Sequence, residues 1–141
     1  MDQKTDPATA AKAIGEAYLE RSMVPDPEGA RAYVSDDFDI TFTGGRRFTG
    51  PDQTAAFNAK RYDWVKKKFL RTDAAYDPAT GDVHVYNTGY LYGEWHDGTT
   101  FETNRYMDSF VVRNGQIVST HVWNDSAEIL LDKAGLSEAP L

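Results

Sequence analysis

The chain from residue 71 to residue 124 is an almost unbroken series of strand-forming segments, and this series limits the possible folds more than any other feature. The segments are rich in β-branched and aromatic residues, and short clusters of Asp, Asn, Pro and Gly separate them, as turns do. Segments joined by such short turns pair as antiparallel strands. The predicted strands cover residues 71–76, 82–95, 100–112 and 116–124.

The first half of the chain is expected to be mostly helical. Asp6 and Asp26 each precede a proline, and an N-cap residue followed by proline is typical of a helix start. A third helix is predicted to begin at Pro51, and the spacing of Asp125 and Glu128 indicates a capping box at the start of a fourth. The predicted helices cover residues 7–24, 27–35, 51–69 and 125–131, with one strand at 38–43.

Helices followed by a meander of strands are typical of an α+β fold in which the helices pack against one face of the sheet. Gly89 and Gly93 lie inside the second long strand, where glycine marks a bend. A bent sheet with helices in its concavity encloses a pocket. The 141 residues suit one ordinary domain, so we expect a single domain over residues 1–141.

Charge and composition exclude several classes of function. The net charge is −7, from 15 Lys and Arg against 22 Asp and Glu, and an acidic surface repels nucleic acid. The basic run at residues 66–68 is interpreted as the solvated end of the third helix. The absence of cysteine excludes disulfides and thiolate chemistry. No apolar run is long enough to span a bilayer, and residues 1–9 lack an apolar signal core, so we expect a cytoplasmic protein without a membrane partner.

Three short patterns, taken in order, resemble a known family. Two aspartates at 36–37 precede a strand, Gly-Pro-Asp at 50–52 opens a helix, and residues 109–118 lead into Trp-Asn-Asp at 123–125. Over nearly the whole chain this resembles the nuclear transport factor 2-like superfamily in its SnoaL-like branch. The resemblance implies a cone-shaped α+β barrel, in which a curved, mostly antiparallel sheet packs against N-terminal helices. The superfamily contains isomerases, dehydratases, epoxide hydrolases, polyketide cyclases, other lyases and non-catalytic binders, so the fold does not choose an activity.

The turn at residues 113–115 sets which side chains share a face of the last two strands. Read as a three-residue hairpin loop, it pairs Phe110 with Val118. Because side chains alternate between faces, one set follows from that pairing, and the resemblance implies that this set lines the concave pocket. The set is Asn104, Tyr106, Asp108, Phe110, Val118, Thr120, Val122 and Asn124.

The resemblance also implies that side chains from three other segments reach the pocket. Ile40 and Phe42 would come from the first strand and Tyr18 from the first helix. The preceding long strand would contribute His84, Tyr86, Thr88, Tyr90 and Tyr92. The opposite, outer face carries Met107, His121 and Trp123, and we expect a homodimer or higher homo-oligomer through it.

Two family catalysts are replaced in this sequence. Tyr18 and Asp108 occupy the places where the ketosteroid isomerase branch carries an oxyanion-hole tyrosine and an aspartic acid that burial keeps protonated. The general base of that branch would fall at Phe42. An acidic residue of the epoxide hydrolase branch would fall at Val122. Neither side chain can move a proton, which disfavours both reactions.

The remaining candidates for catalysis are Asp108, Tyr106, Lys60, His84 and Tyr18. Lys60 and Arg61 lie near the apolar face of the predicted third helix, beside Trp64, where a cation at the pocket mouth would favour ionisation of a substrate phenol. The three histidines lack metal-binding spacing, and no phosphate loop or dinucleotide fingerprint occurs, so we expect no metal and no cofactor. The expected substrate contacts are Phe42, Arg61, Trp64, Tyr86, Thr88, Tyr90, Tyr92, Asn104, Val122 and Asn124.

A tyrosine-rich pocket with one carboxylate suggests a cofactor-independent lyase that acts on a small phenolic aromatic substrate. Resemblance to lyases of lignin-derived diaryl compounds implies, as an example, dehydration and deformylation of a diarylpropane through a quinone methide. A ketosteroid-isomerase-like isomerase or a polyketide cyclase is an alternative, with an enolate as its intermediate. A non-catalytic small-ligand-binding protein is a further alternative.

Overall fold

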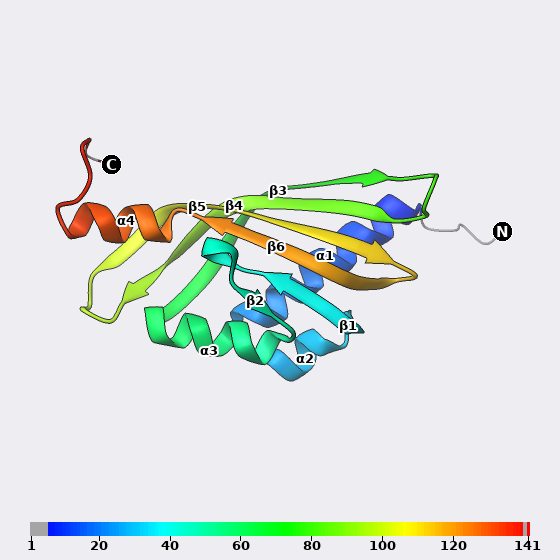
Figure 1. Cartoon of the computed structure of the whole chain (residues 1–141), viewed down its shortest axis with the longest axis horizontal. Helices are drawn as coiled ribbons and strands as arrows, with labels where there is room; N and C mark the ends of the chain where they lie inside the picture. Colours follow the sequence, from blue (N-terminus) through cyan, green and yellow to red (C-terminus); the bar gives the residue numbers. More distant parts are fainter. Residues whose placement is uncertain (1–5, 140) are drawn as a thin grey trace.

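The computed structural model describes residues 6–139 and 141, which form a long curved sheet with helices packed against it (Figure 1). The sheet has six strands in the order β2-β1-β6-β5-β4-β3 and does not close. β1 and β6 run parallel, and the other neighbours are antiparallel. The elements are α1 Pro7–Met23, α2 Pro27–Arg31, β1 Val34–Thr41, the 3-10 turn η1 Thr43–Gly45, β2 Arg47–Phe48, α3 Pro51–Arg61, β3 Tyr62–Tyr76, β4 Val83–Trp95, β5 Thr100–Arg113, β6 Gln116–Asn124 and α4 Ser126–Lys133.

Three of the four predicted helix starts have the expected proline at the first turn, and two have the expected cap. The carboxylates of Asp6 and Asp26 each accept a hydrogen bond from the amide three residues along, at 3.2 and 3.0 Å. The fourth helix forms, but its predicted capping contact is wrong: Asp125 pairs with Arg105 across the strand end, at 2.6 Å. No helix in the described residues is long and apolar enough to cross a membrane.

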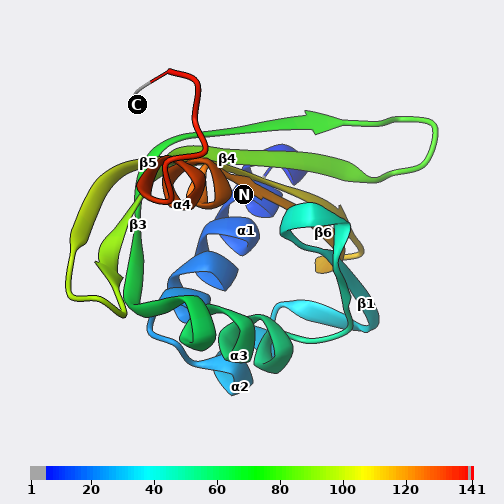
Figure 2. The same cartoon turned by 60° about the vertical axis from the view of Figure 1, so that its left-hand side comes forward.

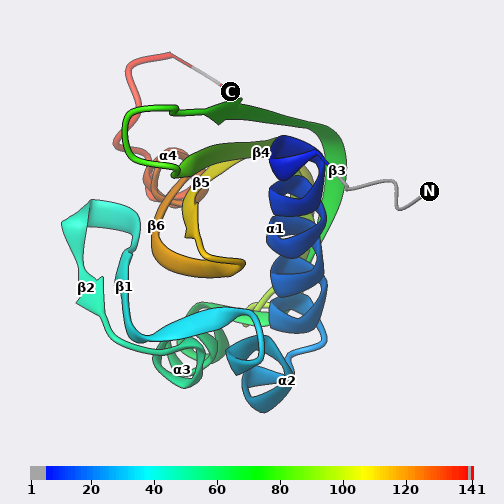
Figure 3. The same cartoon turned by 90° about the vertical axis from the view of Figure 1, so that its right-hand side faces the viewer.

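The sheet bends where the sequence predicted, at the two glycines of β4. A Cβ atom on Gly89 would lie 2.0 Å from the carbonyl oxygen of Lys68, and one on Gly93 would lie 2.3 Å from that of Trp64. The strand pairing shifts register close to both positions. The close approach of the β3 backbone requires glycine, and the bends wrap the sheet around α1, as the end-on view shows (Figure 3).

The third helix is much shorter than predicted. It ends at Arg61, and the chain passes directly into β3 at Tyr62, so residues 62–69 are strand and not helix. The physical reason is the length of its partner, because β4 has 13 residues whose backbone groups need pairing. The turn after Tyr76 aligns the two strands, and full pairing extends β3 back to Tyr62.

The β5–β6 hairpin has a different register from the one predicted, and the predicted facing holds only beyond its bulge. Its turn consists of the two residues Asn114 and Gly115, both with positive φ, at 51° and 76°, which is typical of a type I′ turn. Together with one bulge, this pairs Phe110 with Thr120 instead of Val118. Beyond the bulge the difference is an even number of residues, so Thr120, Val122 and Asn124 keep the predicted face. On the turn side the difference is one residue, so Ile117 pairs with Val112 and is buried on the concave face.

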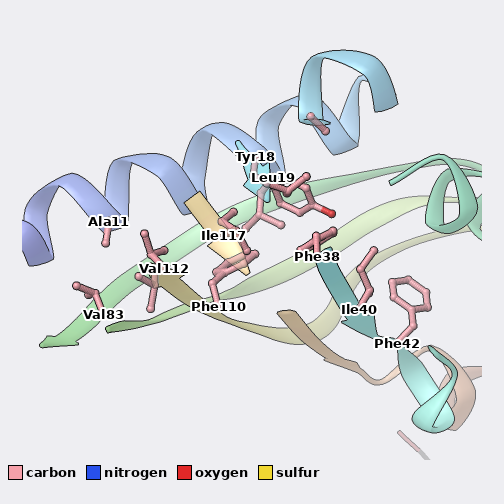
Figure 4. Packing of buried hydrophobic residues seen from close by; sticks show 13 residues of the cluster. Ala11, Tyr18, Leu19, Phe38, Ile40, Phe42, Val83, Phe110, Val112 and Ile117 are labelled. Atoms are coloured by element: carbon pink, nitrogen blue, oxygen red, sulfur yellow. The ribbon is translucent and has the colours of Figure 1, made fainter. Parts of the chain in front are cut away.

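The core lies between α1 and the concave face of the sheet (Figure 4). Tyr18 and Leu19 of α1 contact a group in which Phe110 and Ile117 are almost fully buried. Burial of a side chain of this size contributes about 1.5–3 kcal/mol, so this face of the sheet anchors the helix. A second buried cluster fills the other end of the sheet; its members are Tyr62, Leu91, Trp95, Phe101 and Tyr106.

Candidate active site

A cavity lies between the two buried clusters, where the C-terminal half of α1 and the start of α3 face the sheet. The empty space of the cavity, with its mouth included, is about 550 Å³. The centre of a water molecule can occupy about 50 Å³ of it. Most of its wall is apolar, and its polar groups come from both helices and from the sheet. The lining residues are Tyr18, Leu19, Ser22, Met23, Ile40, Phe42, Thr54, Asn58, Tyr62, Val65, Lys67, Leu91, Asp108, Thr120, Val122 and Asn124.

A buried ion pair is the main charged feature of the cavity. The Nζ atom of Lys67 lies 2.6 Å from Oδ2 of Asp108, and their side chains are only 7% and 1% exposed. Lys67 faces inward because it pairs with the buried Leu91 of β4. The other carboxylate oxygen, Oδ1 of Asp108, is buried without any hydrogen-bond partner. An unpartnered buried acceptor is costly to a fold and marks a place where a ligand can supply the missing donor.

The surroundings set the protonation of the groups beside this pair. Burial raises the pKa of Asp108, and the ammonium of Lys67 opposes that rise. Burial also raises the pKa of the Tyr18 and Tyr106 hydroxyls, and the nearby Asp108 carboxylate raises both further. The two tyrosines therefore stay protonated at neutral pH. Asp108 is the group in this region that can accept a proton.

Tyr106 is held under the ammonium group of Lys67 by a chain of hydrogen bonds. The Lys67 Nζ atom lies 4.1 Å from the centre of the Tyr106 ring, a cation–π contact. The Tyr106 hydroxyl donates to Asn87 Oδ1 at 2.6 Å, and Asn87 Nδ2 donates to Thr72 Oγ1 at 2.9 Å. Thr72 in turn donates to Glu16 of α1 at 2.8 Å. The hydroxyl thus points away from the cavity, and Tyr106, predicted as a catalytic residue, does not line the cavity and contacts Lys67 through its ring.

A second polar group lies beside the start of α4. The Tyr62 hydroxyl lies 2.5 Å from Ser126 Oγ, which also accepts a hydrogen bond from Asn104 at 2.7 Å. The Ser126 amide donates to Asn124 Oδ1 at 3.1 Å. This hydrogen bond fixes the orientation of the Asn124 side-chain amide, and its nitrogen can donate to other partners. Asn124 and Tyr62 line the cavity, whereas Asn104 is fully buried behind them.

Comparisons with known proteins rest on the fold. No protein-family model matches the chain, and no curated protein matches it. Among solved structures, a protein from Jannaschia sp. CCS1 assigned as a SnoaL-like polyketide cyclase superimposes with a TM-score of 0.67, at 14% identity, over 99% of this chain and 100% of the other. The chain has the NTF2-like (nuclear transport factor 2-like) fold. This confirms the resemblance to that superfamily, with its SnoaL-like branch, at the level of the fold.

Two further solved structures share the NTF2-like fold. A protein from Xanthomonas campestris pv. campestris assigned as a polyketide cyclase matches with a TM-score of 0.67 at 19% identity, over 94% of this chain and 100% of the other. An LEH-like epoxide hydrolase of M. tuberculosis matches with a TM-score of 0.63 at 21% identity, over 89% of this chain and 90% of the other. These likenesses describe architecture and leave the activity to be argued from the cavity.

Several of the predicted site residues line the cavity described above. Tyr18 and Asp108 line it next to one another, as the resemblance implied. Phe42 and Val122 also line it, and Asn124 stands at its second polar group. The cavity wall further includes Ile40 and Thr120, whereas Val118 lies at the register shift of the hairpin and does not line it.

Two predicted pocket cations lie elsewhere. Lys60 is exposed at the end of α3, and the guanidinium of Arg61 lies over the ring of Phe57, 4.7 Å from its centre. Neither lines the cavity. The prediction failed because residues 62–69 are strand, so the helix face that would have carried Trp64 and a cation into the pocket does not exist. Trp64 is exposed beside the cavity, in contact with Tyr92 at 6.0 Å between ring centres.

The predicted facing of β4 is wrong by one residue. Val85, Asn87 and Leu91 are buried on the concave face, so the alternate side chains point to the convex face. The reason is packing, because aliphatic side chains cover α1 better than tyrosines do, and the tyrosine rings stay half exposed. The side chains placed on the convex face in this way are His84, Tyr86, Thr88 and Tyr90. Tyr92 does not line the cavity either, but lines a separate hollow with Leu19 and Met23 of α1.

Sequence reasoning missed Lys67 and Tyr62, which are the cation and one of the hydroxyls of the cavity. The strand lengths carried part of the signal, because the long strand ending at Trp95 needs a partner of similar length, and this predicts that residues 62–69 are strand. Counting back from the turn does not predict the facing of Lys67, because regular pairing would place Lys68 opposite Leu91. Two register shifts, at Phe69/Arg71 and Tyr62/Trp64, bring Lys67 opposite Leu91 and Tyr62 opposite Trp95. In residues 6–139, no group of three or more His, Asp or Glu side chains is placed to hold a metal ion.

Proposed function

We propose that this NTF2-like protein is an enzyme that ionises a hydroxyl group of a small aromatic substrate, with Asp108 as the base and Lys67 as the cation that holds the resulting oxyanion. The buried ion pair with its unpartnered Asp108 oxygen carries the proposal. A carboxylate whose pKa is raised by burial is a stronger base than one in water. An ammonium group within hydrogen-bond reach favours the anion that the proton transfer creates.

The reaction that we propose is a cofactor-independent lyase reaction. Asp108 takes the proton of a substrate phenol, and the phenolate expels a hydroxyl group from the para benzylic carbon with its bonding electron pair. Asp108 then gives this proton to the departing hydroxide, which leaves as water. The product is a neutral quinone methide.

The quinone methide can accept the electron pair of a neighbouring carbon–carbon or carbon–hydrogen bond. That electron pair forms a carbon–carbon double bond and restores the phenolate. When the broken bond leads to a hydroxymethyl group, its carbon leaves as formaldehyde, and the hydroxyl proton returns to the Asp108 carboxylate. A lignin-derived diarylpropane is one substrate of this class.

The apolar wall supports an aromatic substrate. Phe42, Leu91 and Val122 present ring and aliphatic surface on the sides of the cavity, and such surface holds a flat ring by burial. Among the described lining residues Asp108 is the only carboxylate and Lys67 the only cation. One acid–base pair suffices for ionisation of a phenol, whereas acid-assisted attack of water on an epoxide would need a second proton-transfer group.

An isomerase or a polyketide cyclase is the second candidate. Tyr18 lines the cavity beside Asp108 and stays protonated, so it could donate a hydrogen bond to an enolate oxygen. In that reaction Asp108 would remove a proton from a carbon next to a carbonyl group. The contact with Lys67 favours the ionised Asp108, so Asp108 would act here as the base and not as the protonated donor of the ketosteroid type. This candidate ranks second because Phe42 stands where the ketosteroid type carries its general base.

The test compares three substrate classes with the same protein. We expect 4-hydroxybenzyl alcohols with an alkyl or aryl substituent to lose water, detected by mass spectrometry of the products, and their phenol methyl ethers to be inert because they cannot form a phenolate. Lys67→Met and Asp108→Asn should each lower kcat/KM by at least about 100-fold. Loss of water from the ethers would refute ionisation of the phenol, and turnover of ketones alone would favour the second candidate. Binding of the phenols without any product would identify a binding protein and refute the enzyme.

A further inference from the structure

A second hollow adjoins the cavity at its mouth and is lined by residues of α1, α3 and the start of β3. The ribbons of these three elements converge in Figure 2. We call the cavity with Asp108 the inner chamber and this hollow the outer chamber. The outer chamber has about 140 Å³ open to the centre of a water molecule, against about 50 Å³ for the inner one. The two chambers share five lining residues and are therefore directly adjacent; these are Ser22, Met23, Asn58, Tyr62 and Val65.

The inner chamber is small for its proposed chemistry. A single water molecule needs roughly 10–15 Å³ of such space, so the inner chamber holds the equivalent of a few water molecules. That is room for the reacting part of a substrate, such as one phenol ring. Any larger substrate must place its remaining atoms beyond the shared residues, in the outer chamber.

The outer chamber offers an apolar surface with its charges already engaged. The Lys66 ammonium donates hydrogen bonds to the carbonyl oxygens of Met23 and Val24, at the end of α1, where a cation also offsets the helix dipole. The Asp63 carboxylate is paired with His96. Neither side chain is free to hold an ion. The apolar part of the lining is Met23, Val24, Pro25, Ala55, Ala59, Tyr62, Trp64 and Val65.

We propose that the outer chamber is a binding subsite for a second, uncharged apolar group of the substrate, such as a second aryl ring, while the phenol occupies the inner chamber. The inference rests on the proposed function and assigns the second part of its substrate. Ala55 and Ala59 lie one helical turn apart on α3, and they line the outer chamber but not the inner one. Their small side chains set the space for that group, and Trp64 provides an aromatic wall.

The test uses two probes and three variants of the full-length protein. The probes are 4-methylphenol, which fits one chamber, and 4-(2-phenylethyl)phenol, which spans both. Ala55→Leu and Ala59→Leu fill the outer chamber, and Ala56→Leu, at an exposed position of the same helix that lines neither chamber, is the matched control. Isothermal titration gives the affinities, and thermal unfolding checks that each variant is folded.

We expect the wild-type protein to bind the two-ring probe at least about tenfold more tightly than 4-methylphenol, because the second ring removes apolar surface from water. Ala59→Leu or Ala55→Leu should abolish this preference and leave the affinity for 4-methylphenol within about twofold, and Ala56→Leu should change neither affinity.

Other outcomes separate the subsite from the proposed function. If 4-methylphenol binds but the two-ring probe binds no more tightly, the subsite is refuted and the proposed function stands. If the preference survives in both filled variants, the subsite is likewise refuted. If the preference depends on Ala55 and Ala59 but no phenolic alcohol is turned over, the subsite stands and the enzyme fails. Failure of the wild-type protein to bind either phenol would overturn both.

Discussion

Lys67 and Asp108 keep their charges inside the protein because each compensates the other. Removing one partner leaves the remaining charge buried, which costs about 3–5 kcal/mol, whereas replacing both by apolar residues is often neutral. We therefore expect Lys67→Met and Asp108→Leu to destabilise the protein singly and the double variant Lys67→Met/Asp108→Leu to recover most of the loss. Urea unfolding of all four proteins measures the coupling. Additive losses would show that the pair does not share its stabilisation.

The pKa of Asp108 predicts a pH dependence of turnover. Burial raises this pKa above the ordinary value of about 3.9, and the base is the deprotonated form. Turnover should therefore be lost as pH falls through the raised pKa and should recover as pH rises through it. A profile of kcat/KM for a phenolic alcohol is expected to have its ascending limb above the ordinary aspartate range. The limb should move in Asp108→Glu, and a limb unchanged by that substitution would assign it to another group.

Single side chains differed in how well the sequence predicted them. Asp108 and Tyr18 were placed correctly, because their strand and helix were recognised from local patterns and the resemblance assigned their facing. Lys67 was not, because three consecutive lysines look like a solvated surface, and the local pattern contains no sign that the middle one is buried. Its environment comes from pairing with Leu91, a contact that is distant in sequence.

The bend of β4 makes a prediction about its glycines. A Cβ atom on Gly89 would meet the Lys68 carbonyl oxygen, a backbone atom that cannot rotate away. Gly89→Ala should destabilise the protein by about 1–3 kcal/mol or push β3 outward. Thr88→Ala, at the neighbouring half-exposed position, is the matched control and should stay within about 0.5 kcal/mol. Equal unfolding midpoints for the two variants would show that the close approach is relaxed easily.

A histidine links the β4–β5 turn to the end of α3. His96 Nε2 lies 3.0 Å from the carbonyl oxygen of Ala59, and its Nδ1 pairs with Asp63. The hydrogen bond to Asp63 raises the pKa of His96 above its ordinary value. The link is therefore fully present below the ordinary histidine pKa of about 6.5 and is lost as pH rises through the raised one.

This link predicts a small loss of thermal stability between about pH 6 and pH 8.5 that depends on both partners. We expect the melting temperature of the wild-type protein to fall more over this range than that of His96→Gln, and Asp63→Asn to behave like His96→Gln. Thermal unfolding at the two pH values measures the difference. The same fall in all three proteins would assign the pH dependence to other groups.

The last three strands were predicted well in extent, whereas the facing of β4 was predicted wrongly. Local composition fixed the bounds of β6 and nearly those of β4 and β5, because turns interrupt the chain clearly. The facing of β4 depends on which side contacts α1, and alternation alone is symmetric between the two faces. Buried Val85 and Leu91 decide it, and their contacts come from elements far away in the chain.

The convex face of the sheet is the surface through which we expect copies of the chain to associate. It carries a hollow of about 340 Å³ open to the centre of a water molecule, in which Trp123 is 50% exposed and stacks on His121. We expect a homo-oligomer through this face, and Trp123→Glu should shift the molar mass measured by light scattering toward that of one chain, 15.8 kDa. Glu102→Gln, at an exposed position outside the hollow, is the control. A wild-type protein with the mass of one chain would refute the expectation.

The architecture as a whole followed from the order of its elements. Helices first and a meander afterwards fixed the α+β class, and β1 was recognised although its pairing with β6 is parallel and distant. The junction between α3 and β3 could not be read locally, because residues 62–69 have apolar positions that fit either period. That junction positions Lys67. The same ambiguity therefore explains both the wrong end predicted for the third helix and the failure to predict Lys67 as the cation of the cavity.

The three consecutive lysines of β3 make the site tolerant of changes in strand length. Lys66 reaches the end of α1, Lys67 enters the cavity, and Lys68 is exposed. A slip of one residue in this strand would exchange the faces, yet the position opposite Leu91 would still be filled by a lysine, either Lys66 or Lys68. A one-residue insertion or deletion at either end of the run can therefore accumulate during evolution without stripping Asp108 of its counter-ion.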